Sequence, residues 1–492
     1  MSDRKKERDA SNTKPVDFGG FLDRRSLLKG VAGLAGGAAA GSFLPGTAEA
    51  QVSNQSRAIL IKGGHVISMD STIGDIENGD VLIERGAITS VGRNLRAPNA
   101  QVVDASSKLV LPGFVDAHRH AWMTQQRSFM VPADFFGIVV KTMEPLYRPE
   151  DAYVGVLLGC VESLNAGITT MFDFAHIMFN DDFADAVIRG LKEPGIRAVF
   201  GHTLPHLPSS PNALDGARRV QKKHFTSDDQ LVTFAMGSRI GTPNILSVFG
   251  PGIGDPWENA QHDIKLAREL GAKRIHFHAI SVKRLHDAGM LGADLTFVHP
   301  GGQTDEEVKM VADSGGTVVI TPPAGGDPIP CQRFVRAGIP IGLGIDDGPG
   351  IPTDFFLAMK ALLKNDRNFE RQRATKEGGA PAVLTHRQAL EFATIGGAHA
   401  IGLDQKIGSL TPGKRADVIT IDLDNLTFPF DKDPLPAVIS EAQASDVSWV
   451  FVDGQVHKRD GKLVGIDRKR LRNLVQGSYE YLLSKANLPP NV

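Results

Sequence analysis

Two histidines separated by one arginine follow an apolar segment in the stretch GFVDAHRHAW, residues 113–122. Side chains two positions apart on a β-strand point to the same side, so His118 and His120 would project together from one face. Imidazole nitrogens bind Zn²⁺ and Fe²⁺, and a carboxylate often completes the ligand set. An H-x-H spacing occurs often by chance, so the prediction depends on where the other reactive residues fall.

Further histidines and acids also stand at the ends of apolar runs. His276 and His278 lie in RIHFHAI, His299 follows LTFV, and Asp346 and Asp347 follow IPIGLGI. Ends of parallel strands meet at one edge of a sheet, so these side chains would lie near the H-x-H pair. An open coordination position in such a site would allow a water molecule to be activated.

We therefore predict a metal site formed by His118, His120, His278 and Asp346. A histidine alone on a strand is more often an ordinary core or surface residue. We interpret four other histidines in that way: His176, His202, His206 and His276.

The elements that must position these residues form a repeating pattern between residues 113 and 403. Apolar strand-like runs alternate there with helical stretches, which is typical of a parallel sheet. Eight runs fit: GFVDAHRH, GITTMFDFAH, IRAVFGHTL, LVTFAMGS, RIHFHAI, LTFVHPG, GTVVITPPA and IPIGLGIDD. Eight βα units are what a closed (β/α)₈ barrel requires, and its chemistry lies at the carboxyl ends of the strands.

Short alternating strands separated by turn residues precede and follow this middle part. They predict one small β-sandwich domain built from residues 51–112 and 404–470, with a C-terminal helix and tail over residues 471–492. The expected fold class is thus α/β, a TIM-like (β/α)₈ barrel with a β-sandwich made from both ends of the chain.

Residues 1–50 differ in composition from the rest. Arg24 and Arg25 precede a Gly/Ala-rich, mildly apolar region and a small-residue ending at 48–50. This order resembles a twin-arginine export signal removed after Ala50. It predicts the twin-arginine machinery as a partner, a periplasmic or secreted location, and no stable membrane anchor after cleavage.

The composition is that of an ordinary globular protein. Over 492 residues, 41% are hydrophobic and 22% charged, and the formal net charge is −2. This balance gives no broad attraction to nucleic acid or acidic lipid. The expected partner is a small-molecule substrate. The sequence leaves the substrate, the native metal and the oligomeric state open, and a homo-oligomer is compatible with it.

The chain resembles the amidohydrolase superfamily, and within it the single-metal cytosine deaminase and chlorohydrolase-like branch. The resemblance covers nearly all of residues 57–465. The segments that carry it are LVLPGFVDAHRH, AGITTMFDF, FVHPGGQTDEEVKMVADSGGTVVITP, IPIGLGIDD, ATIGGAHAIGLDQKIGSLTPGKRADVITID and VFVDGQVHKRDGK.

The resemblance implies roles for individual residues. His118 and His120 match the first-strand metal ligands, His278 the fifth-strand ligand, and Asp346 the eighth-strand carboxylate. His299 matches a histidine beside the activated water or the polarised group of the substrate. The implied cofactor is one divalent ion per subunit, with Zn²⁺ favoured and Fe²⁺ as the alternative.

The chain departs from the pattern of this superfamily at two places, and each departure disfavours one kind of member. The fourth strand, LVTFAMGSRIG, holds no lysine, which disfavours the carbamylated-lysine bridge of two-metal members. Deaminases of this branch usually carry H-x-x-E on the fifth strand, with the glutamate as proton shuttle. Here Ser281 stands three residues after His278, which disfavours deamination of a nucleobase-type ring.

The sequence therefore predicts hydrolysis of a non-peptide C–N bond, of amide, carbamate or urea type, in a small aromatic molecule. Asp346 would accept a proton from the activated water and pass it to the leaving nitrogen, and His299 would help to polarise the substrate. Two alternatives remain open. One is a deaminase or dechlorinase of a heteroaromatic ring with an acid such as Asp347, and the other is a non-catalytic periplasmic metal- or ligand-binding protein.

The substrate pocket is poorly encoded. The segment AWMTQQRSFMVPADFFGIVV after the first strand is rich in apolar residues. It fits either a lid that favours an apolar or aromatic substrate or a helix packed on the barrel rim. Candidate substrate contacts are Trp122, Gln125 and Arg239.

Overall fold

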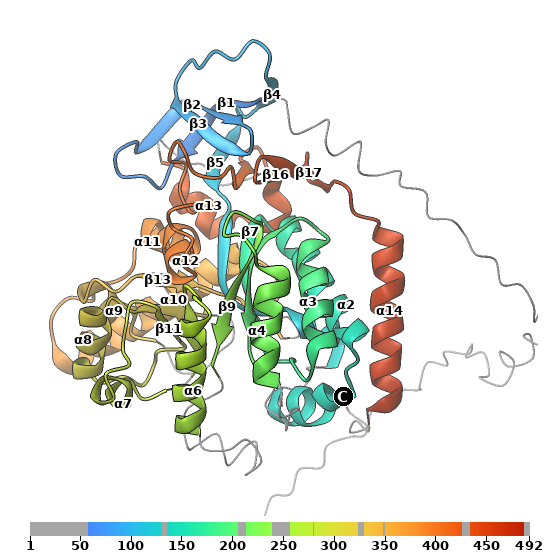
Figure 1. The fold of residues 1–492 in the computed structure, drawn as a ribbon. Coiled ribbons are helices and arrows are strands. Elements are labelled where there is room, and N and C mark those ends of the chain that lie inside the picture. The colour runs from blue at the N-terminus through green and yellow to red at the C-terminus, as the bar shows by residue number, and fades with distance from the viewer. Residues whose placement is uncertain are drawn as a thin grey trace, which may run out of the picture. The chain divides into compact units, whose positions relative to one another are not determined.

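A barrel of parallel strands forms the larger part of the structure, a computed structural model (Figure 1). It describes residues 58–129, 135–204, 213–238, 256–278, 280–322, 329–347, 350–425 and 433–486. The predicted export signal and Arg239 lie outside the described residues.

The barrel strands lie in chain order, except that the last pairs with the first, and all paired neighbours are parallel. They are β6 (Phe114–His120), β7 (Ile168–Ala175), β8 (Arg197–His202), β9 (Val232–Gly237), β10 (Ile275–Phe277), β11 (Leu295–Val298), β12 (Thr317–Ile320), β13 (Ile341–Leu343) and β14 (Asp346–Asp347). All eight predicted runs form strands, and the last run forms two short ones. Because β13 pairs with β12 and β14 pairs with β6, the eighth strand closes the barrel.

The interior of the barrel is filled by side chains. Its apolar core contains Val115, Ala117, Phe172, Phe174, Val199, Ala235, Val298, Val319, Ala398 and Ala400. Gly344, between β13 and β14, is needed for closure. A Cβ atom there would lie 2.9 Å from the carbonyl oxygen and 3.1 Å from the Cβ of His118.

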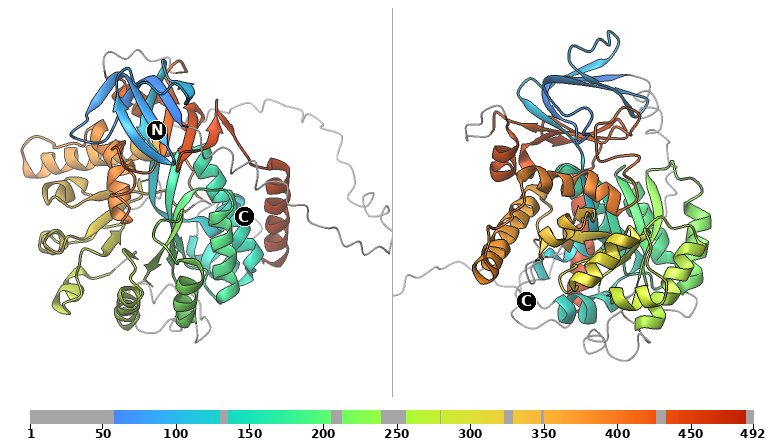
Figure 2. Two further views of the ribbon diagram at one scale, coloured as in Figure 1. Left: turned by 45° about the horizontal axis from the view of Figure 1, so that its top comes forward. Right: turned by 90° about the vertical axis from the view of Figure 1, so that its left-hand side faces the viewer.

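Helices cover the outside of the barrel (Figure 2). They are α2 (Pro149–Asn165), α3 (Asp181–Lys192), α4 (Ala213–His224), α6 (Pro256–Glu269), α7 (Val282–Asp287), α8 (Asp305–Ser314), α9 (Cys331–Arg336) and α10 (Phe355–Glu377). Local sequence explains their ends. In α3, for example, the Asn180 side chain accepts hydrogen bonds from two first-turn N–H groups, which have no partner within the helix.

Further helices lie in the described parts of the chain. They are α11 (His386–Ala393), α12 (Ile395–Ala400), α13 (Leu435–Glu441), η1 (Ala121–Phe129), η2 (Phe135–Met143), η3 (Glu144–Leu146) and η6 (Ala444–Asp446). Ala398 and Ala400 place α12 against the barrel core. The apolar segment that follows β6 begins with the helical turns of η1.

Nine strands from both ends of the chain form a second sheet, as the sequence predicts. They are β1 (Ile59–Ile67), β2 (Asp75–Glu84), β3 (Ala87–Gly92), β4 (Gln101–Asp104), β5 (Lys108–Pro112), β15 (Val418–Asp422), β16 (Val447–Val452), β17 (Gln455–Arg459) and β18 (Lys462–Leu463). The two halves join where β5 and β15 pair antiparallel, with Val110 opposite Thr420. Strands of both halves share a separate apolar core that includes Ile61 and Phe451.

The last helix, α14 (Arg468–Lys485), packs along α2. Leu471, Leu474 and Val475 contact a buried cluster that includes Leu157 and Val161. None of the helices in the described ranges is long and apolar enough to cross a membrane.

Candidate metal centre

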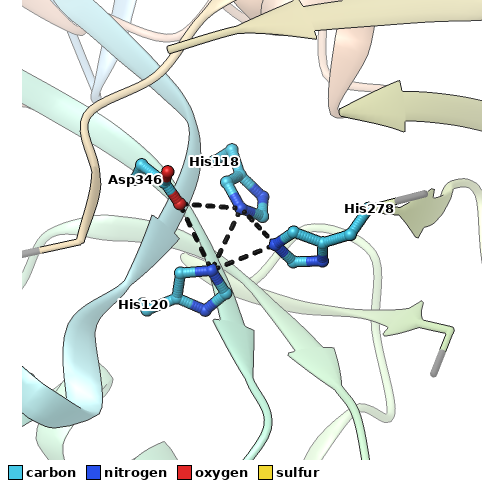
Figure 3. Close-up of side chains that lie close together, drawn as sticks. All are labelled: His118, His120, His278 and Asp346. Carbon is cyan, nitrogen blue, oxygen red and sulfur yellow. Dashed lines mark hydrogen bonds and ion pairs between the residues drawn. The ribbon is translucent and has the colours of Figure 1, made fainter. Parts of the chain in front are cut away.

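Three histidines and one aspartate converge at one end of the barrel (Figure 3). The Nε2 atom of His118 lies 3.2 Å from that of His120 and 3.1 Å from that of His278, and the latter two are 3.1 Å apart. The Oδ1 atom of Asp346 lies 3.4 Å from Nε2 of His118 and 3.3 Å from Nε2 of His120. Each residue thus offers one ligand atom to a common point.

These four side chains come from three strand ends. His118 and His120 end β6, His278 directly follows β10, and Asp346 begins β14. They therefore occupy the carboxyl ends of the first, fifth and eighth strands, where (β/α)₈ barrels carry their active sites. The structure brings together all four residues of the predicted ligand set.

The electrostatics of the group suit a cation. Burial lowers the pKa of His118 to about 3, and burial together with neighbouring imidazoles holds the pKa of His278 well below its usual value. The pKa of Asp346 also lies well below its usual value, because the nearby histidines, His299 first, outweigh the effect of burial. Neutral imidazoles beside a charged carboxylate are the ligand states that a divalent ion requires.

A hydrogen bond of His120 supports the same conclusion. The Nδ1 atom of His120 lies 3.1 Å from the carbonyl oxygen of Phe174, which accepts the ring proton. This contact leaves the Nε2 lone pair of His120 directed at the other ligand atoms, as in known metal sites. The residues present therefore fit one divalent metal ion.

His299 stands beside this group and is more accessible than its members. Its Nε2 atom lies 3.5 Å from Oδ2 of Asp346, and its Nδ1 atom lies 2.9 Å from Oγ1 of Thr321. The His299 side chain is 35% exposed, whereas that of His118 is fully buried. His299 can therefore reach a bound substrate while it faces the Asp346 carboxylate.

Ser281 has a structural contact of its own. It is the N-cap residue that precedes α7, and its hydroxyl oxygen accepts a hydrogen bond from the backbone N–H of Arg284 at 3.3 Å. Asp347, the other candidate acid, accepts a 2.8 Å hydrogen bond from the N–H of Gly350. Burial, and then the charge of Asp346, raise the pKa of Asp347 above its usual value.

The sequence of the barrel and its neighbouring strands matches one known family. The model of the amidohydrolase family matches residues 109–457, well over half of the chain. The chain belongs to the amidohydrolase family.

Relatives of this amidohydrolase align over most of its length. A 5'-deoxyadenosine deaminase from Methanosarcina barkeri is 28% identical over 454 residues, which cover 87% of this chain and 99% of that protein. A 5-methylthioadenosine/S-adenosylhomocysteine deaminase from Symbiobacterium thermophilum is 28% identical over 426 residues, 82% of this chain and 94% of that protein.

Solved structures share the fold. An adenosine deaminase from Xanthomonas campestris with bound zinc has a TM-score of 0.75 at 22% identity and covers 87% of this chain and 99% of its own. A zinc-bound atrazine chlorohydrolase from Arthrobacter aurescens has a TM-score of 0.74 at 21% identity, with 86% and 100% covered. The family and the ligand group together make this protein a metal-dependent hydrolase of non-peptide C–N bonds, so the non-catalytic alternative is not retained.

The described ligand group of this amidohydrolase is suited to one metal ion. The fourth strand, β9, contains no lysine, and the polar residue that follows it, Ser238, bonds to Asp263 of α6 at 3.2 Å. The structure therefore offers no fourth-strand lysine to bridge a second ion within the described ranges.

The predicted substrate contacts lie in different places. Trp122 is fully buried and packs edge-on against Tyr147 at 4.8 Å and against His176 at 5.1 Å between ring centres. The amide nitrogen of Gln125 donates to the carbonyl oxygen of Asp151 and to Oγ of Ser478, so η1 joins α2 and α14 there. The structure thus brings Trp122 near the ligand group and directs Gln125 toward the helices.

His176, interpreted from the sequence as an ordinary core or surface residue, lies beside the ligand group together with Glu144, which the sequence did not mark. The ring of His176 lies 4.6 Å from that of His120, and its Nδ1 atom lies 3.9 Å from Oε2 of Glu144. Both side chains are buried. His176 directly follows β7, so its position at a strand end was a signal, whereas nothing in the sequence around Glu144 marked it. By contrast, His276 stacks on Phe172 at 3.6 Å in the barrel core.

Proposed function

We propose that this amidohydrolase cleaves an amide, carbamate or urea C–N bond in a small aromatic molecule. The observation that carries the proposal is Ser281. Its hydroxyl is part of a helix cap, and a hydroxyl has too high a pKa to shuttle protons near neutral pH, as deamination of a ring requires. A reaction that needs a single proton carrier fits this site better.

Asp346 supplies that carrier. One oxygen of its carboxylate lies near His118 and His120, and the other lies near His299. It can take a proton from the attacking water and give it to the leaving nitrogen, which is basic enough in an amide, carbamate or urea intermediate. His299 then donates a hydrogen bond to the substrate oxygen on which negative charge develops.

We propose zinc as the metal, held by His118, His120, His278 and Asp346. The donor set of three imidazoles and one carboxylate supports this choice, as do the zinc-bound structures with the same fold. When bound there, such an ion would supply a lowered pKa, near neutrality, to water at the site.

An aromatic substrate fits the surroundings of the ligand group. The ring of Phe174 lies 4.4 Å from that of His278 and 5.3 Å from that of His120. Trp122, Tyr147 and His176 form a second group of rings, which meets the ligand group where the ring of His176 lies 4.6 Å from that of His120. Aromatic walls of this kind favour a flat apolar group beside the reacting bond.

Deamination of a heteroaromatic ring is the second candidate. It is supported by the aligned relatives, which carry the names of deoxyadenosine and methylthioadenosine deaminases. It is also supported by the raised pKa of Asp347, since a raised pKa makes a carboxyl group better suited to carry a proton to a ring nitrogen.

Side-by-side assays of the zinc-loaded protein separate the two candidates. The first predicts turnover of aryl amides, carbamates or ureas and slower release of ammonia from adenosine-type, cytosine-type and triazine substrates by a factor of about 10²–10⁴. Efficient ammonia release that is lost in Asp347→Asn would favour the second candidate. Efficient ammonia release that Asp347→Asn leaves unchanged would contradict both assignments of the proton carrier.

We also propose that residues 1–50 direct export by the twin-arginine route, with the mature enzyme periplasmic or secreted. The proposal rests on Arg24, Arg25 and the small-residue ending at Ala50. Fractionation of cells that express the full chain tests it. Replacement of both arginines by lysine should leave the uncleaved protein in the cytoplasm.

A further inference from the structure

Arg119 stands between two ligand histidines, and its side chain is fully buried. In the pairing of β6 with β7, Asp116 lies opposite Met171 and Arg119 lies opposite Asp173. Three steps along β6 therefore match two steps along β7, which is a β-bulge. The bulge brings Asp116 and Arg119 to the same face, with Nη1 of Arg119 3.6 Å from Oδ2 of Asp116.

The guanidinium reaches the segment that follows Asp346. Its Nη2 atom donates a 2.7 Å hydrogen bond to Oγ1 of Thr353 and lies 3.9 Å from Oε2 of Glu162 in α2. The Thr353 hydroxyl donates in turn to Glu162 at 3.0 Å. Arg119 thus connects the strand of His118 and His120 to the chain seven residues beyond Asp346.

Asp116 holds the other side of the same segment. Its Oδ1 atom accepts a 3.0 Å hydrogen bond from the N–H of Ile345, which immediately precedes Asp346. Asp346 itself pairs with Arg119 in the sheet and has a φ of 74°. This left-handed conformation is uncommon for a residue other than glycine, and the sheet pairing and the hydrogen bond to Ile345 hold it here.

Burying an arginine costs free energy, because its charge loses its hydration. Apolar side chains of similar volume often stabilise a protein as well as buried ion pairs do. Among the described residues, moreover, neither Nε nor Nη1 of Arg119 has a hydrogen-bond partner. Stability alone therefore does not account for a charge at this position.

We propose that Arg119 is a positioning residue that, through Asp116 and Thr353, fixes the Asp346 carboxylate relative to His118 and His120. The inference rests on the metal-dependent hydrolysis stated above and is independent of which substrate class is cleaved. It extends the metal centre to the outer face of β6.

The experiment measures zinc affinity by competition with a chelator, the visible spectrum of the cobalt-substituted protein, and the Tm of the metal-free protein. In Thr353→Val, which removes one hydroxyl and keeps the charge, we expect weaker zinc binding and altered cobalt bands with little change in Tm. In Arg119→Met we expect zinc affinity to fall by about 10–100-fold, as for other residues that orient ligands. Arg127→Met is the matched control, because Arg127 pairs with the same Glu162 from the surface, and it should stay within about twofold of wild type.

The double variant Arg119→Met/Glu162→Gln separates positioning from charge compensation, because the Glu162 carboxylate lies 3.9 Å from the Arg119 guanidinium. If Arg119 positions Asp346, removing a neighbouring carboxylate restores Tm but leaves zinc affinity low and the cobalt bands altered. Restoration of zinc affinity in the double variant, or wild-type affinity and spectra in Thr353→Val, would overturn the proposal. These measurements need no substrate, so they stand apart from the test of the proposed reaction.

Discussion

The two faces of β6 carry two buried polar clusters that differ in kind. On the inner face, His118 and His120 meet His278 and Asp346 at distances that fit one cation. On the outer face, Arg119 lies near three carboxyl groups, at 3.6 Å from that of Asp116 and 3.9 Å from that of Glu162, with Asp173 opposite it on β7. A barrel strand can therefore place its reactive groups on one side and hold their geometry from the other.

The clusters also differ in how burial acts on their charges. On the inner face burial keeps imidazoles neutral, as in His118, whose pKa falls to about 3. On the outer face burial raises the pKa of Asp173 to about 7 and that of Asp116 to about 6, and Arg119 only partly opposes this effect. The shifted pKa values of the inner-face cluster therefore lower the stability of the fold in acid. Those of the outer-face cluster lower its stability as the pH rises toward 7.

Loss of an inner-face ligand should have the largest effect. In His118→Ala, one imidazole nitrogen at about 3 Å from two others is removed. We expect the protein to lose both its metal and its turnover, as measured by metal content after dialysis and by activity. Retention of wild-type turnover in a fully demetallated sample would contradict the metal-dependent reaction itself.

The next effect concerns a residue beside the ligand group. His299 faces Asp346 but does not belong to the described ligand set. In His299→Ala we expect kcat to fall by about 10²–10⁴, which is typical when one proton-transferring or hydrogen-bonding group is removed. Metal content should stay near that of wild type, and its loss would show that His299 is a ligand.

The closure of the barrel can be disturbed at Gly344. In Gly344→Ala the new methyl group would contact the backbone and Cβ of His118. We expect the free energy of unfolding to fall by about 1–3 kcal/mol in denaturant titrations, with weaker zinc binding because His118 shifts. Gly477→Ala is the control. It lies in α14 with nothing near its Cβ position, and should be neutral or slightly stabilising.

The smallest expected effect is the change of stability with pH that comes from Asp173 on the outer face of β6. The folded protein holds a proton on Asp173 up to about pH 7, whereas the unfolded chain releases it near pH 4. The contribution of this group to stability is therefore complete below about pH 4 and is lost as pH rises toward 7. We expect the Tm of wild type, relative to Asp173→Asn, to decrease over that interval, and a difference that increases would contradict the raised pKa.

The sequence allowed the strands and the ligand set to be predicted, because both depend on local patterns. The alternation of apolar runs with helical stretches predicted the eight barrel strands. The two-residue period of a strand predicted that His118 and His120 share one face. The contacts of Arg119 on the outer face could not be predicted, because they depend on a β-bulge between Asp116 and Arg119. A bulge interrupts the two-residue period of a strand, and nothing in the sequence marks it. The Glu144 and His176 pair joins η3 to β7 and depends in the same way on packing between distant segments.

The junction of β5 with β15 has a consequence for how the protein is made. Val110 pairs with Thr420, so 310 residues separate the partners in the chain (420 minus 110). At about 5–20 residues per second, a ribosome needs roughly 15–60 s to synthesise the partner of β5. During that delay the nascent KLVLP strand, four of whose five residues are buried in the finished protein, offers an open apolar edge. Chaperone contact or aggregation during translation should therefore begin at this strand rather than in the barrel.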